Sequence, residues 1–173
     1  LFGKNYYLYH GLTLAMHIAS SFLIYKLVGK FWTSFRIAFS SSLIYAIHPA
    51  HFVAMYWISG SAVNIGFFFL LLALYLYLNG RKALGILLFP LALMASEAMI
   101  AGIGLFALVL SLGKLRAQKR YLVTLILSTV VFFIVKLLFT ASATFDIYQL
   151  EVSAATIAAF RYYILRTLGF AET

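Results

Sequence analysis

Two histidines flank a proline near the start of the stretch LIYAIHPAHFVAMYWISG. These residues, His48 and His51, are half of the chain's 4 histidines. Imidazole nitrogens and carboxylate oxygens bind divalent cations, and both kinds of group can also move protons during catalysis. With Glu97 as a third group, they are candidate catalytic residues and weak candidate ligands of a divalent cation. Interfacial histidines at a helix end would show the same spacing, so the sequence alone assigns no cofactor.

Glu97 lies within the otherwise apolar run LALMASEAMI. An ionisable side chain in such a run indicates a functional site, because its charge is costly to place in a membrane. The other interpretation is a carboxylate at a helix turn that reaches water. Glu97 is therefore the strongest single candidate for a catalytic role.

Four more polar residues are candidates for binding a substrate or a lipid phosphate. His10 and His17 are seven positions apart, which places them on one helical face about two turns from each other. They could line a cavity that opens outward, or they could make interhelical hydrogen bonds that pack a bundle. Lys136 and Arg161 could bind a phosphate through charge-assisted hydrogen bonds. The alternatives are a snorkelling lysine and an arginine that anchors a helix at the membrane interface.

The composition indicates an integral membrane protein whose first partner is the lipid bilayer. Of the 173 residues, 65% are hydrophobic and only 10% are charged, whereas a soluble domain has about a quarter of its residues charged. The net charge of +9 sits in short clusters between apolar runs, so it does not indicate a nucleic-acid partner. The absence of cysteine excludes disulfides, thiolate metal sites and thiol nucleophiles within this sequence.

The apolar runs predict an all-α, polytopic transmembrane bundle of about six to seven membrane helices, forming a single domain over residues 1–173. About 20 helical residues are needed to cross a bilayer core roughly 30 Å thick. On that scale the predicted spans are residues 7–28, 37–47, 62–78, 121–140 and a shorter helix at 156–170. The chain starts at Leu1 instead of methionine, so we expect it to be part of a longer protein that continues at both ends.

Three basic clusters predict the topology of the bundle, because positively charged loops favour the cytoplasmic side. They are Lys26, Lys30 and Arg36; Arg81 and Lys82; and Lys114, Arg116, Lys119 and Arg120. The chain must then cross twice between the first two clusters, with its outer turn at Pro49.

Residues 83–112 lie between two basic clusters that both favour the cytoplasmic side. This stretch must therefore cross the membrane twice, as a hairpin broken around Ser96 and Glu97. A single helix would bury the carboxylate near the bilayer centre, at a cost of about 2.5 to 3.5 kcal/mol or more. We therefore expect His10, His48, His51 and Glu97 to share the outer face.

Several of these stretches resemble the C-type (GT-C) membrane glycosyltransferases, in particular their tetratricopeptide-repeat O-mannosyltransferase branch. YHGLTLAMHIASSFLIYKLVGK is similar to a helix with the motif H-x-x-N-x-x-x-H, matched at His10 and His17 with Thr13 in the asparagine position. The signature H-P-x-H-x-E-x-V-x-W is matched at His48, Pro49, His51 and Trp57. An L-S-K-E turn is matched at Glu97, and RYYILRTLGF is loosely similar to a later R-Y-L helix.

The resemblance implies a multi-pass enzyme that transfers a sugar from a polyprenyl-phosphate donor to an acceptor on the outer or lumenal side. Its membrane would be the bacterial inner membrane or the endoplasmic reticulum. The resemblance also implies a catalytic carboxylate in a loop upstream of Leu1.

The chain departs from the family pattern at several charged positions. Val53 stands in the acidic position of the signature, Gly60 to Val63 replace a G-R-x-D motif, and Ser96 replaces the lysine of the turn. Two explanations stay open, namely a divergent transferase with a different polar set that includes Asn64, and a relative that kept the fold without the activity. The competing hypothesis is a non-catalytic membrane subunit of a larger complex, with its histidines buried or holding a pigment or haem.

Overall fold

The computed structural model describes residues 6–57, 60–112 and 119–140. Every regular element within these ranges is helical, which confirms the all-α class. The elements are α1 (Tyr6–Phe31), α2 (Phe35–Ile47), the 3₁₀ helix η1 (Pro49–His51), α3 (Phe52–Tyr56), α4 (Ser61–Leu78), α5 (Lys82–Ala95), the 3₁₀ helix η2 (Glu97–Ala101), α6 (Gly102–Leu112) and α7 (Lys119–Thr140). The predicted helix at 156–170, with Arg161, lies outside the described residues.

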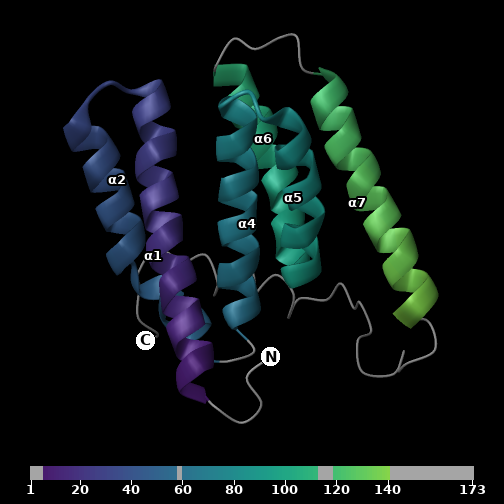
Figure 1. Ribbon diagram of the computed structural model, residues 1–173, viewed down its shortest axis with the longest axis horizontal. Helices are drawn as coiled ribbons and strands as arrows, with labels where there is room; N and C mark the ends of the chain where they lie inside the picture. Colours follow the sequence, from purple (N-terminus) through teal and green to yellow (C-terminus); the bar gives the residue numbers. More distant parts are fainter. Residues whose placement is uncertain (1–5, 58–59, 113–118, 141–173) are drawn as a thin grey trace, which may run out of the picture.

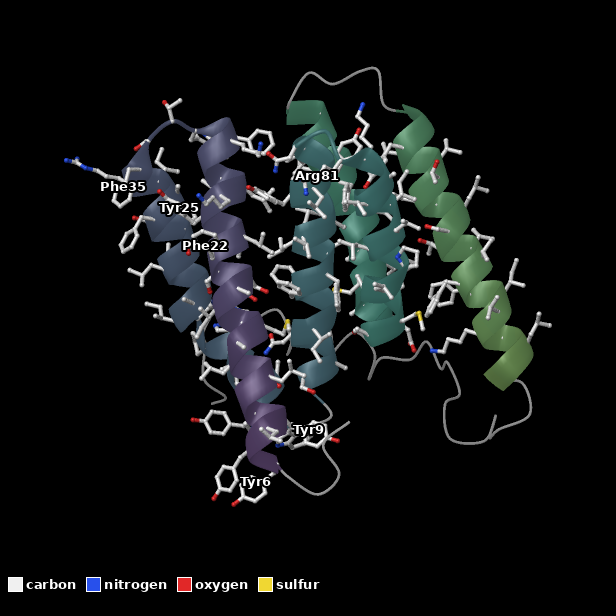
Figure 2. The ribbon with its side chains drawn as sticks, viewed as in Figure 1. Tyr6, Tyr9, Phe22, Tyr25, Phe35 and Arg81 are labelled. Carbon is white, nitrogen blue, oxygen red and sulfur yellow. The ribbon has the colours of Figure 1, made fainter. Side chains whose placement is uncertain are left out.

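The long helices run up and down side by side, so that the chain reverses at two opposite ends (Figure 1). The end that holds His48, His51, Ser61 and Glu97 is called the histidine end below. The end that holds Lys30, Arg36, Arg81 and Lys82 is called the basic end. Figure 2 shows Tyr6 and Tyr9 near the histidine end, and Arg81 near the basic end. The predicted separation of the polar candidates from the basic clusters is thus present in the fold.

Both predicted chain breaks are confirmed. Helix α2 ends at Ile47, and His48 before the proline is extended (ψ 128°), as expected for a residue that precedes proline. Residues 83–112 are divided at Ser96, which is extended (φ −155°, ψ 129°) between α5 and η2. Glu97 therefore lies at a helix turn at the histidine end.

Three of the described helices are long and apolar enough to cross a membrane, namely α1, α4 and the segment Tyr121–Leu138 of α7. Helix α2 could form a fourth span with Pro49–Tyr56, although the two are bent by 43° at the proline. Helices α2, α5 and α6 have 13, 14 and 11 residues, so the longest is only about 21 Å. The expected six to seven membrane helices are therefore not confirmed.

Small residues bring α4 and α5 into close contact along an antiparallel seam. Gly66 and Ala73 on α4 are seven positions apart, and so are Gly85 and Ala92 on α5. A Cβ atom at Gly66 would lie 3.1 Å from the Ala92 carbonyl oxygen, and one at Gly85 would lie 2.7 Å from the Ala73 carbonyl oxygen. Small residues at such positions let helix backbones approach closely in membrane proteins.

The turn between α4 and α5 depends on one glycine. Gly80 has a φ of 82°, a left-handed conformation that a side chain disfavours. The Arg81 amide donates to the Leu76 carbonyl at 2.9 Å, and the Gly80 amide donates to the Tyr77 carbonyl at 3.0 Å. This pattern is a Schellman motif, which satisfies the last carbonyls of α4 and starts the return helix.

The arrangement predicts which positions an impermeant thiol reagent labels from the same side of the membrane. The chain has no cysteine, so His51→Cys, Glu97→Cys and Arg81→Cys each introduce a single reporter. In sealed vesicles of known orientation, we expect positions 51 and 97 to be labelled from the outer side and position 81 only after permeabilisation. Labelling of position 81 together with position 51 in sealed vesicles would contradict this topology.

Candidate functional site

The buried face of α1 changes from polar to apolar along its length. Thr13, His17 and Ser20 are buried toward the histidine end, followed by Leu23 and Leu27 toward the basic end. These positions follow the three- and four-residue spacing of one helical face. The polar residues of α1 are therefore collected inside the bundle at the histidine end.

His10 and His17 both donate to carbonyl groups near the proline break. His17 Nε2 lies 3.0 Å from the Ala46 carbonyl oxygen, and His10 Nδ1 lies 3.2 Å from that of Met55. Ala46 and Met55 are in the last turns of α2 and α3, where carbonyls have no partner within their own helix. In a membrane such groups need a partner inside the protein. The two histidines thus make interhelical hydrogen bonds, one of the two roles expected for them.

His48 supports the chain reversal locally. Its Nδ1 accepts a hydrogen bond from the Ala50 amide at 3.1 Å, the arrangement of a side chain that caps the start of a helical turn. A neutral ring that accepts at Nδ1 carries its proton on Nε2. The Nε2–H group is then the remaining donor of the His48 ring.

The rings of His17, Tyr45 and His51 form a tight group, called the imidazole cluster below. Their centroids are 5.0 Å apart for His17 and Tyr45, 4.8 Å for His17 and His51, and 4.4 Å for Tyr45 and His51. His48 lies next to the cluster, 6.2 Å from the His51 ring. The sequence-based candidates did not include Tyr45. Its position about one helical turn before His48 is the sequence feature that could have identified it.

One buried polar atom in this region, His17 Nδ1, has no hydrogen-bond partner among the described residues. Because a carbonyl can only accept, His17 Nε2 must carry the proton of the neutral ring, and Nδ1 then offers a lone pair. An unpaired buried acceptor costs about 1–3 kcal/mol. The half-buried His51 ring beside His17 makes the cluster a candidate ligand site.

Asn64 belongs to the same region. Its side chain is buried, and Nδ2 donates weakly to the Ala54 carbonyl at 3.4 Å and lies 3.6 Å from Met55 Sδ. The expectation that Asn64 supplements the polar set stays a prediction. Gly66, two positions further along α4, lies against Met99 and Ser96, so the first turns of α4 separate the α3 segment from the Glu97 turn.

Glu97 forms an ion pair with Lys136 of α7, not with the histidines. The side chains of Lys136 and Glu97 are 36% and 57% exposed, and solvent limits such a pair to about 0–1 kcal/mol. The prediction that Lys136 binds a lipid phosphate is untested, and in this structure its ammonium is already paired.

The proposed cation site of His48, His51 and Glu97 is not formed. Across residues 6–57, 60–112 and 119–140, no three His, Cys, Asp or Glu side chains gather so that they could hold a metal ion. The reason is that Glu97 turns toward α7, whereas His48 and His51 pack beside α1 and α2.

Part of this chain is similar in sequence to a curated protein. No family model and no solved structure match the chain. The chain is similar to protein O-mannosyl-transferase F38B6.6 of Caenorhabditis elegans. The two are 36% identical over 78 residues, which are 43% of this chain and 11% of the relative. The similarity is consistent with a glycosyltransferase, and the matched part is a small share of the relative's length.

Proposed function

We propose that the chain is part of a GT-C membrane glycosyltransferase that transfers a sugar from a polyprenyl-phosphate donor to an acceptor hydroxyl on the outer or lumenal side. The similarity to a protein O-mannosyl-transferase favours mannose as the sugar and a protein hydroxyl as the acceptor. The three candidate membrane spans are compatible with a multi-pass enzyme whose donor is a lipid.

The observation that carries the proposal is the imidazole cluster at the histidine end. His51 is half-buried between His17 and His48, and a neutral imidazole can accept a proton near physiological pH. In the proposed reaction His51 orients the acceptor hydroxyl and takes part in its deprotonation. The buried His17 packs against His51 and is proposed to fix the orientation of the His51 ring.

The Glu97–Lys136 pair is proposed to serve the lipid end of the donor. A phosphate that approached the histidine end would compete with the carboxylate of Glu97 for the Lys136 ammonium. Arg161 is proposed as a second cation for the same phosphate. In this arrangement Glu97 keeps Lys136 in place in the absence of donor.

The test is transfer of radiolabelled mannose from polyprenyl-phosphate mannose to a serine- and threonine-rich peptide by the full-length protein. We expect His51→Gln to lower transfer by about 100-fold or more, because general acid–base groups contribute about 10²–10⁴-fold. His48→Gln is the matched control, since it is the same replacement three positions away at a histidine that caps a turn, and we expect a loss below about tenfold.

Equal transfer by His51→Gln and the unsubstituted protein would reject the role of His51. The absence of any transfer by the unsubstituted protein, with folded and purified material, would instead favour the non-catalytic subunit.

A further inference from the structure

A cavity of about 370 Å³ lies at the basic end, far along the helices from the imidazole cluster. It is an open pocket lined by residues from the end of α1, the loop to α2, the start of α2 and the end of α4, elements that meet at one end of the bundle in Figure 1. Its polar and aromatic lining includes Lys26, Lys30, Trp32, Ser34, Tyr75 and Asn79. The volume is within the range of about 300–1,000 Å³ that small-molecule sites occupy. This opening is called the basic cavity below.

Two lysines place positive charge in the wall of the basic cavity. Lys26 and Lys30 are one helical turn apart on α1, where like charges repel each other. The Lys30 ammonium lies 5.8 Å from the centre of the Tyr75 ring, and the Lys26 ammonium lies 5.1 Å from that of Phe22. Aromatic faces attract cations at such distances, so Tyr75 holds the Lys30 ammonium at the cavity. The Lys26 ammonium lies between Phe22 outside the lining and Tyr25 within it, 6.0 Å from the latter ring.

These charges have no carboxylate partner in the described part of the chain. Glu97 is the single acidic residue within residues 6–57, 60–112 and 119–140, and it pairs with Lys136 at the histidine end. An anion in the basic cavity would offset the repulsion between Lys26 and Lys30. Within the described residues, an external anion is therefore the available counter-charge for the two lysines.

The start of α2 adds backbone donors on the opposite wall. Helix α2 begins at Phe35, has 13 residues, and its N-cap Ser34 makes no side-chain capping bond. The first amides of a helix lack acceptors within it, and the positive end of the helix dipole lies there. Thr33, Ser34 and Phe35 line the cavity. Two ammoniums and an uncapped helix start therefore face the same space.

We infer that the basic cavity binds a phosphate group, as the headgroup phosphate of an anionic lipid or as a soluble phosphate. Trp32 is 49% exposed at the rim, and tryptophans at such positions sit at the headgroup level of a bilayer. Figure 2 shows Tyr25 and Phe35 toward this end of the molecule, and their rings pack at 6.2 Å. The site is separate from the proposed transfer site and does not depend on it.

Trp32 can report on this site directly. The chain has 2 tryptophans, so Trp57→Phe leaves Trp32 as its one tryptophan, which can be excited selectively at wavelengths that tyrosine does not absorb. In phosphatidylcholine nanodiscs that contain equal fractions of brominated-chain phosphatidylglycerol or brominated-chain phosphatidylcholine, we expect stronger quenching by the anionic lipid. Each lysine near an anionic headgroup contributes roughly fivefold local enrichment.

The double substitution Lys26→Gln with Lys30→Gln should abolish the difference between the two lipids. Arg81→Gln with Lys82→Gln is the matched control, because it removes the same charge from the same end outside the cavity lining. It should leave the difference nearly unchanged. Circular dichroism of each variant confirms that its helices are formed.

Inorganic phosphate separates the two sources of the anion. If it leaves lipid-dependent quenching unchanged, the site takes a lipid headgroup. If millimolar phosphate reverses the quenching, or alters Trp32 emission in discs of phosphatidylcholine alone, the site takes a soluble phosphate. Equal quenching by both lipids without any phosphate response would overturn the inference, as would equal losses in the two double variants.

Discussion

Gly85→Ala is expected to destabilise the bundle by about 1–3 kcal/mol, the usual cost of inserting a methyl group into a packed interior. The new Cβ atom would lie 2.7 Å from the Ala73 carbonyl oxygen and 3.2 Å from the Tyr77 Cβ atom. A backbone carbonyl in the middle of α4 cannot rotate away, so α4 and α5 must separate. The free energy of unfolding, measured by titration of detergent-solubilised protein with sodium dodecyl sulfate, gives the loss.

Gly104→Ala is the matched control for this substitution. A Cβ atom at Gly104 would meet no atom within 4 Å, and alanine is favoured over glycine within a helix by about 1 kcal/mol. We therefore expect Gly104→Ala to be neutral or stabilising. If both substitutions changed stability by the same amount, the close approach of α4 and α5 at Gly85 would be wrong.

His17→Phe is expected to lower the free energy of unfolding by about 1 kcal/mol, because the lost hydrogen bond to the Ala46 carbonyl is partly offset by removal of the unpaired Nδ1. Phenylalanine fills a similar volume and retains ring contacts with Tyr45 and His51, but it cannot donate to the Ala46 carbonyl. His17 is only 6% exposed, but Ala46 is itself exposed, so solvent at the surface of α2 limits the loss. The same titration in detergent measures the effect.

His10→Phe provides the comparison, since His10 donates to a helix-terminal carbonyl from the same helix. His10 is only partly buried, so water can take its place as the donor to the Met55 carbonyl, and we expect a smaller loss than at His17, below about 0.5 kcal/mol. Equal losses at the two positions would contradict the assignment of His17 as the buried support of the proline break.

The sequence by itself determined the helical class, the chain breaks and the division into two ends. Proline at position 49 disfavours a helical conformation at His48, so the end of α2 could be predicted locally. The hairpin at Ser96 and Glu97 followed from the alternation of basic clusters and from the cost of a carboxylate within the bilayer. The number of membrane spans could not be predicted from the sequence. Helices of 11 to 14 residues are as apolar as membrane spans but are too short to reach across the bilayer core.

Only the tertiary structure decided which polar groups meet. The partners of His17, His10 and Lys136 are 29, 45 and 39 positions away in the chain, and residue types alone do not select among partners at that separation. Glu97 was expected near the histidines on the basis of a shared end, yet the packing of α7 beside α5 and α6 brings Lys136 to it instead. The imidazole cluster and the basic cavity likewise depend on how α1 packs between α2 and α4, because the side chains that form them come from separate helices.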